Sequence, residues 1–207
     1  PKFVEFQPWA PRFSVLALEM CDVDRLIANL VTAVDYRKRI LAAYGLRSWD
    51  TMHGPVIIVP VDEMAELGGI DAATLAAALT DPDAKARSNA IRDGKNAMQF
   101  RIAMLASLAR QARFVGIWLI CATQYPSAEV IDQQIRTQLT VKAMLRVSRD
   151  EQIRVINGGS ETPAVTVGSI PKNERGGLWL TDMPGETQPV RARASFVTDT
   201  HITDRVR

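Results

Sequence analysis

The sequence contains little of what disulfide frameworks, zinc centres and membrane spans require. Its two cysteines, Cys21 and Cys121, lie far apart in the 207 residues, and we expect both to be reduced core thiols. The two histidines have no cysteine or second histidine at ligand spacing, which argues against a zinc site. No serine or cysteine stands in a nucleophile motif with a matching histidine. No apolar run approaches the roughly 20 residues that cross a bilayer.

Composition and length are those of an ordinary globular domain. A hydrophobic share of 47% and a charged share of 23% are typical of soluble proteins, so neither disorder nor a membrane protein is indicated. The length is sufficient for one sizeable core. The net charge of +2 indicates polyanion binding only weakly, since a mixed solvated surface explains it equally well.

Apolar segments of strand and helix length alternate along the chain. This order predicts an α/β fold with a mostly parallel sheet flanked by helices and a C-terminal β-hairpin at its edge. The expected elements are a strand over 3–6, a long helix that ends near Gly45, a strand before Asp62, a helix over 96–113, strands over 115–122 and 140–147, and a hairpin that turns at Pro184 and Gly185.

Two adjacent acids, Asp62 and Glu63, follow the β-branched run in GPVIIVPVDEMAEL. This is the Walker B layout, because ligands of open α/β sheets bind beyond the carboxyl ends of the strands. In this interpretation Asp62 holds a hydrated Mg²⁺ and Glu63 polarises the water that attacks a γ-phosphate. The alternative is that Asp62 caps a helix beginning near Met64 and Glu63 is a solvated first-turn acid. Pro60 lacks a ladder donor, which predicts broken pairing or a bulge near the end of the strand.

A second apolar strand also ends in polar residues. In RFVGIWLICATQYPS the run is followed by Thr123 and Gln124 and then by a turn at Pro126. Because parallel strands end at the same edge of a sheet, these side chains are candidates to face the same ligand as the acids. Thr and Gln are also common loop residues, so a purely structural role remains an alternative.

The chain resembles the motor domain of FtsK/SpoIIIE DNA translocases along nearly its whole length. The segments that carry the resemblance are PKFVEF, YRKRILAAYGL, VIIVPVDEMAEL, LARQARFVGIWLICATQYPS, TVKAMLRVSRDEQIRVINGG and GGLWLTDMPGETQPVRARASFVTD. The ATQ-x-PS element is its most specific part, and the VEFQPWAP opening is similar to transfer ATPases of actinobacterial conjugative plasmids and integrative elements. The resemblance implies a RecA-like fold, ATP and Mg²⁺ as cofactors, and a hexameric ring that moves double-stranded DNA.

The same resemblance implies roles for individual residues. Asp62 and Thr123 would contact the Mg-nucleotide, with Asp62 holding the metal through water. Glu63 would be the catalytic acid, and Gln124 would be the sensor that feels the γ-phosphate.

Arginines of the second half of the chain are candidates for two further roles. Arg146 and Arg154 match positions from which an arginine can stabilise the transferring phosphoryl group across a subunit interface. Arg136 is a candidate for this role and for DNA contact. Each of the three is equally compatible with a structural role, because arginine also pairs well with buried carboxylates.

Three departures from the family pattern qualify the resemblance. No GxxxxGK[ST] phosphate-binding loop occurs in the 207 residues, so we expect that loop upstream of residue 1 and expect this chain alone to bind ATP poorly. Residues 1–207 would then be the C-terminal portion of a single motor domain. Residues 68–95 exceed what the family core needs and are interpreted as an insertion. Tyr125 stands where relatives commonly carry arginine.

The favoured hypothesis is an ATP-dependent double-stranded DNA translocase of a conjugative plasmid or integrative element. One alternative is an ATPase similar to those of type VII secretion systems, which moves protein substrates. Another is a catalytically silent assembly module, as the missing loop would suggest. We expect a cytoplasmic location, with attachment to the inner face of the membrane only through segments outside this chain.

Overall fold

The computed structural model of the protein describes residues 7–70, 72–127, 131–157, 165–198 and 200–201. Two compact units are present: unit 1 comprises residues 1–23 and 141–207, and unit 2 comprises residues 24–140. The strand expected over residues 3–6 lies outside the described residues. Within the described ranges, no helix is both long and apolar enough to cross a membrane.

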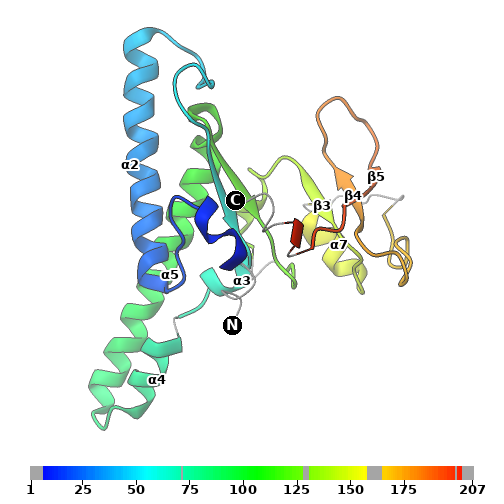
Figure 1. The fold of residues 1–207 in the computed structure, drawn as a ribbon. Helices are drawn as coiled ribbons and strands as arrows, with labels where there is room; N and C mark the ends of the chain where they lie inside the picture. Colours follow the sequence, from blue (N-terminus) through cyan, green and yellow to red (C-terminus); the bar gives the residue numbers. More distant parts are fainter. Residues whose placement is uncertain (1–6, 71, 128–130, 158–164, 199, 202–207) are drawn as a thin grey trace. The chain divides into compact units, whose positions relative to one another are not determined.

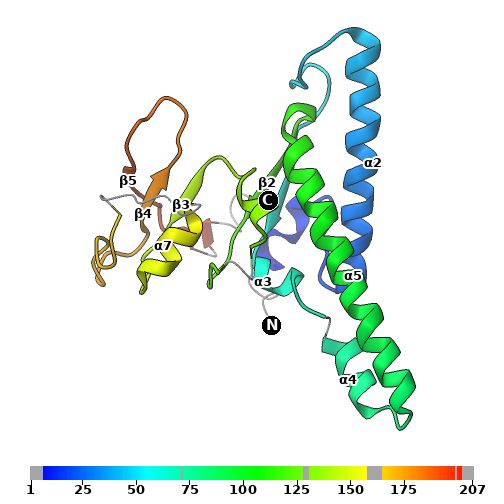
Figure 2. The same ribbon diagram turned by 180° about the vertical axis from the view of Figure 1, so that it is seen from behind.

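Unit 2 is built from long helices beside a parallel pair of strands. Figures 1 and 2 show α2 and α5 side by side along the strands, with α4 against the N-terminal half of α5. This arrangement confirms the predicted α/β fold. Its elements are α2 (Met20–Tyr44, which begins in unit 1), β1 (Ile57–Val61), α3 (Met64–Leu67), α4 (Ala72–Thr80), α5 (Ala84–Gln111), η2 (Arg113–Val115), β2 (Ile117–Cys121) and α6 (Gln133–Arg136).

Pairing of β1 with β2 is parallel and continuous from Ile57↔Ile117 to Val61↔Cys121. The predicted disruption at Pro60 is therefore wrong. The Ile57 amide donates to Gly116 O at 2.9 Å, and Val61 O accepts from Ala122 N at 2.8 Å. The backbone N–H and C=O groups of the odd-numbered residues of β1 therefore point toward β2. The nitrogen of Pro60 points away from β2, and its missing hydrogen interrupts no bond of this ladder.

The two faces of this strand pair differ in exposure. Residues Ile57, Val59 and Ile117 lie on the more buried face. The opposite face carries apolar side chains that are exposed in the structure: Ile58, Pro60, Trp118 and Ile120. The segment thus alternates in exposure and is not the uniformly buried run that its composition suggests.

Helix α2 buries one apolar stripe, and a residue of this stripe, Arg37, is hydrogen-bonded to the segments that precede the two strands. Its buried residues recur at helical spacing, and the helix ends where Gly45 adopts a left-handed φ of 63°. Arg37 lies on this stripe. It donates to the carbonyl oxygens of Val115 (2.8 Å), Gly116 (3.2 Å) and Pro55 (2.8 Å), and it stacks on Trp49 with Cζ 4.3 Å from the ring centroid. Arg37 is therefore a buried residue and not part of a solvated basic face of the helix.

Helix α5 begins twelve residues before the predicted start, at Ala84 instead of residue 96. Asp83 caps it by accepting from the amide of Lys85 at 2.8 Å. The alanine, lysine and arginine residues directly after the cap favour a helix, which then continues through the polar stretch before residue 96. Together with α4, the first half of α5 forms a helical hairpin over most of the segment interpreted as an insertion.

Unit 1 contains an antiparallel sheet in the order β3–β4–β5. The predicted hairpin is confirmed: β4 pairs with β5, and Gly185 in the turn between them has a φ of 87°. The third strand, β3, pairs with β4, and its Met144 is buried against α7. The elements of this unit are η1 (Gln7–Arg12), β3 (Lys142–Met144), α7 (Asp150–Ile156), β4 (Gly177–Thr181) and β5 (Val190–Arg193).

Candidate functional site

The two acids lie in a short connection whose two ends are both hydrogen-bonded to Ala122, the residue that follows β2. Ala122 donates its amide to Val61 O at 2.8 Å and accepts from the Met64 amide at 2.9 Å. Asp62 and Glu63 therefore stand opposite a single residue, as in a β-bulge. This pair of backbone bonds holds both acids at the carboxyl edge of the parallel strands.

Glu63 turns toward the end of β2. Its Oε1 accepts from the Thr123 hydroxyl at 2.5 Å and from the Ala65 amide at 3.2 Å, while its Oε2 accepts from the Gln124 amide at 3.1 Å. The first distance lies in the range of a charge-assisted O–H···O⁻ bond. Glu63 is thus the N-cap of α3, with an extended φ of −139°. The alternative interpretation named the wrong acid as the cap, although the helix does begin at Met64.

The Thr123 hydroxyl has a defined orientation. It accepts from the amide of Tyr125 at 3.4 Å, so its own proton points at Glu63. The side chain of Gln124 is exposed, whereas its backbone amide is engaged by the carboxylate. Residues 123–125 therefore form one hydrogen-bonded turn around the end of Glu63.

Asp62 is exposed beside this cluster. The described residues contain no group of three or more His, Cys, Asp or Glu side chains that could cage a metal ion. Mg²⁺ bound with a nucleotide does not need such a cage, because it keeps several waters and takes one or two carboxylates plus phosphate oxygens. A solvent-facing Asp62 fits this requirement as a ligand through water.

A buried arginine, Arg101, binds the end of α3, the short helix that follows the acids. Arg101 of α5 donates to the carbonyl of Leu67 at 3.0 Å and forms a bidentate pair with Asp24 of α2, at 2.6 and 3.1 Å. Its side chain is 3% exposed, so this arginine serves the interior of the unit and not its surface. This contact of Arg101 was not predicted from the sequence. The signal was its spacing, since Arg101 falls between Met98 and Leu105 on the apolar stripe of the helix.

Known proteins are similar to the chain in sequence and in fold. The DNA translocase FtsK of Helicobacter pylori is 26% identical over 215 residues, covering 98% of the chain and 21% of that protein. The FtsK of Pseudomonas syringae pv. tomato is 33% identical over 101 residues, covering 48% of the chain and 11% of that protein. The pCW3 conjugation coupling protein TcpA, solved as a monomer with ATPγS, has a TM-score of 0.64 and 22% identity, covering 91% of the chain and 48% of TcpA.

The resemblance to FtsK-type motor domains is confirmed. No family model matches the chain. The chain spans about a fifth of the length of the FtsK that it matches end to end. The likeness to TcpA extends over most of the chain and shows that the fold is shared.

The arginines expected from the FtsK resemblance lie in different units. Arg136 ends α6 in unit 2, is half-buried, and its Nε has no hydrogen-bond partner within the part of the chain that the structure describes. Arg146 and Arg154 are exposed and belong to unit 1. The structure brings together Asp62, Glu63, Thr123 and Gln124, whereas the arginine roles stay predictions.

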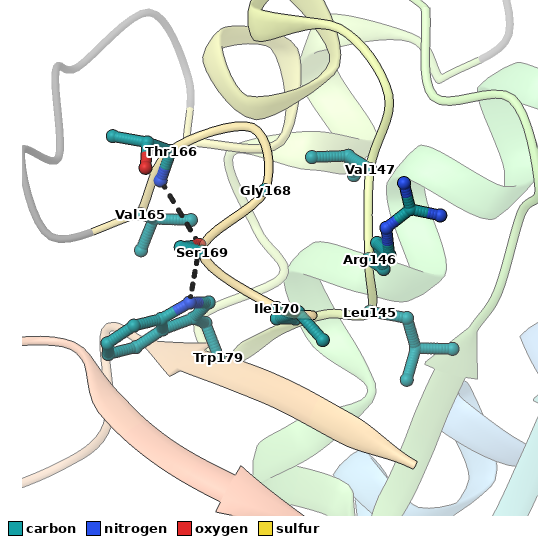
Figure 3. A pocket seen from close by; sticks show the side chains of 9 residues that line it. All are labelled: Leu145, Arg146, Val147, Val165, Thr166, Gly168, Ser169, Ile170 and Trp179. Carbon is teal, nitrogen blue, oxygen red and sulfur yellow. Dashed lines mark hydrogen bonds between the residues drawn. The ribbon is translucent and has the colours of Figure 1, made fainter. Parts of the chain in front are cut away.

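Arg146 borders a small hollow that is drawn in Figure 3. The hollow has a volume of about 10 Å³, which holds at most one water molecule. Trp179 Nε1 donates to the Ser169 hydroxyl at 3.0 Å across it, and the guanidinium of Arg146 points away from both. This hollow is a packing feature of unit 1, and Arg146 is directed outward from it.

Proposed function

We propose that the chain is the acid- and sensor-bearing part of an ATP-driven double-stranded DNA translocase, the motor of a conjugative plasmid or integrative element. The observation that carries the proposal is the direct bonding of Glu63 to Thr123 and Gln124 beside an exposed Asp62. A nucleotide motor needs such an edge, where one residue holds the metal, one activates water and one reads the phosphate. The FtsK relatives and the conjugation protein TcpA support both the motor and its setting.

ATP with Mg²⁺ is the cofactor in this proposal. Mg²⁺ supplies charge neutralisation on the phosphate oxygens. Asp62 orients the hydrated ion, Glu63 takes a proton from the attacking water, and the exposed side chain of Gln124 contacts the γ-phosphate. The likeness to a coupling protein solved with ATPγS supports a nucleotide. The 207 residues contain no phosphate-binding loop motif, so in this proposal that loop comes from sequence outside them.

Double-stranded DNA is the proposed cargo, and a hexameric ring of copies is the proposed assembly. Arg136, whose side chain is only partly buried, is the proposed DNA contact in unit 2. Arg146 or Arg154, both exposed, would serve the active site of a neighbouring copy. DNA gripped in this way is held through phosphates, without base reading.

The catalytic assignment is tested by replacing Glu63 with glutamine in a protein that carries both this chain and the phosphate-binding loop. Glu63→Gln should leave ATP binding intact and lower turnover by about 10²-fold or more, which is the usual contribution of a general base. Glu66→Gln is the matched control, because it neutralises an acid on the exposed side of the same short helix. Unchanged turnover in Glu63→Gln would remove this residue from the chemistry.

The cargo is tested with the unmodified protein. Duplex DNA should stimulate ATP hydrolysis, and the stimulation should fall steeply between about 50 and 200 mM salt because phosphate contacts release counterions. A protein-secreting ATPase would hydrolyse ATP without responding to DNA. A silent assembly module would show no hydrolysis that depends on Glu63.

A further inference from the structure

Most hydrogen-bond acceptor positions of the Glu63 carboxylate are already used by protein donors in the structure. A general base must offer a lone pair to the water it activates, and a carboxylate has about four lone-pair positions. At least three of them accept hydrogen bonds from the protein: from the Thr123 hydroxyl, the Gln124 amide and the Ala65 amide. These bonds hold the Glu63 side chain against the end of β2 and leave few acceptor positions of its carboxylate for a water molecule.

We propose that the Thr123 hydroxyl and the Gln124 amide form a latch that stores Glu63 in a resting orientation, and that contact between the Gln124 side chain and a phosphate opens it. The inference rests on the proposed function, since it concerns the regulation of the same site. It gives Thr123 a different role from the nucleotide contact expected from the sequence. Thr123 acts through Glu63 and is a positioning residue.

The latch and the sensor belong to one short turn, which couples them mechanically. The Tyr125 amide donates to the Thr123 hydroxyl that in turn donates to Glu63, and Gln124 contributes its amide from between them. Hydrogen bonds weaken steeply when the donor angle falls below about 120°. A rotation of the Gln124 backbone, driven by its side chain engaging a phosphate, therefore loosens the hold on both oxygens of Glu63.

The surrounding backbone restricts the movement to the side chain. Ala122 fixes Val61 and Met64 with two backbone bonds, one on either side of the acids. Arg101 holds the last residue of α3, Leu67. With the segment fastened before and after Glu63, release of the latch swings the carboxylate and leaves the strand in place.

The test uses Thr123→Val, which removes the hydroxyl and keeps the β-branched shape, in the protein that carries the phosphate-binding loop. We expect turnover without DNA to rise on the order of tenfold, with the KM for ATP unchanged and the stimulation by duplex DNA reduced by the same factor. Thr123→Ser keeps a donor and should behave as the wild type. Thr80→Val is the control, because among the described residues the Thr80 hydroxyl bonds to carbonyls of its own helix, those of Ala76 and Ala77.

A double variant, Thr123→Val with Glu63→Gln, shows whether the gained turnover passes through the carboxylate. We expect it to be as inactive as Glu63→Gln alone. Turnover in Thr123→Val that is unchanged or lower, in a variant that still binds ATP, overturns the latch. A fall in turnover that serine restores would instead make Thr123 an aligning residue, and a higher KM would place it on the nucleotide.

Failure of the latch is distinguishable from failure of the proposed function. If Glu63→Gln abolishes hydrolysis while Thr123→Val behaves as the wild type, only the latch is wrong. If Glu63→Gln hydrolyses ATP at the normal rate, the function proposed for this site is wrong and the latch falls with it.

Discussion

Replacing Gly116 with alanine tests how helix α2 is fastened to the parallel strands. Gly116 has a φ of 71°, and a Cβ added there would lie 2.5 Å from Cδ1 of Trp49 and 3.2 Å from Nη1 of Arg37. The left-handed backbone costs an L residue about 1 kcal/mol, and overpacking of this kind adds about 1–3 kcal/mol. Trp49 has little room to yield, because its amide donates to Phe114 O at 2.8 Å and its indole donates to Gly54 O at 3.2 Å. We expect Gly116→Ala to lower the free energy of unfolding by about 2–4 kcal/mol.

Urea unfolding followed by circular dichroism at about 222 nm measures this loss, since the helical signal comes mainly from the long helices α2 and α5. Gly45→Ala is the matched control. Gly45 also has a left-handed φ, of 63°, but an added Cβ there meets nothing within 4 Å. The control should lose only about 1 kcal/mol. If Gly116→Ala is no less stable than Gly45→Ala, the close packing of Gly116 on Trp49 is refuted.

Two further predictions concern buried polar groups. Asp24→Asn should destabilise the protein by about 3 kcal/mol, because it leaves Arg101, whose side chain is 3% exposed, without its counter-charge. Arg101→Met should destabilise it by less, because the Asp24 side chain that it leaves unpaired is 46% exposed and can be hydrated. Urea unfolding measures both losses, and the reverse order would contradict the argument. Burial raises the pKa of Cys121 to about 11, so this thiol should stay neutral and resist iodoacetamide at pH 8. Cys21 is exposed, so the expectation that it is a core thiol is wrong, and it should react. Mass-spectrometric mapping measures the alkylation rate of each cysteine. The rate for Cys121 should increase only as the pH approaches 11 or when the protein unfolds. Equal rates for the two cysteines at pH 8 would contradict the burial of Cys121.

The meeting of the acids with Thr123 and Gln124 could be predicted from the sequence. Each pair follows an apolar run of strand length, and parallel strands bring their carboxyl ends to one edge. The register between Val61 and Cys121 places the two polar pairs next to each other. Periodicity and topology were sufficient for this part of the site.

The orientation of Glu63 could not be predicted in the same way. It depends on the two backbone bonds that Ala122 makes on either side of the acids, and alanine gives no sequence signal for such a role. Which acid turns toward the neighbouring strand is decided by the shape of this connection. The sequence therefore identifies the acids without assigning the cap.

The burial of Arg37 and Arg101 was not predicted from the sequence. Arg37 follows Leu30 and Val34 and precedes Leu41 at helical spacing, so its position on the apolar stripe was visible. Charge alone favours solvent exposure for such a residue, in conflict with its position on the stripe. Burial is tolerated because the guanidinium finds three carbonyl oxygens at the start of the strands, and these acceptors converge only in the folded protein.

Asp62 and Glu63 are adjacent in sequence but have different surroundings, which suits them to the different tasks proposed for them. Asp62 is exposed, which suits the role proposed for it as a ligand of a magnesium ion that keeps its waters. Glu63 is half-buried and held by donors from two segments, so its position is set by protein groups and not by bulk water. Because both acids lie between the same two backbone bonds, a change that loosens Glu63 need not move Asp62. In the proposed function, metal binding by Asp62 and the timing of hydrolysis by Glu63 can therefore be controlled separately.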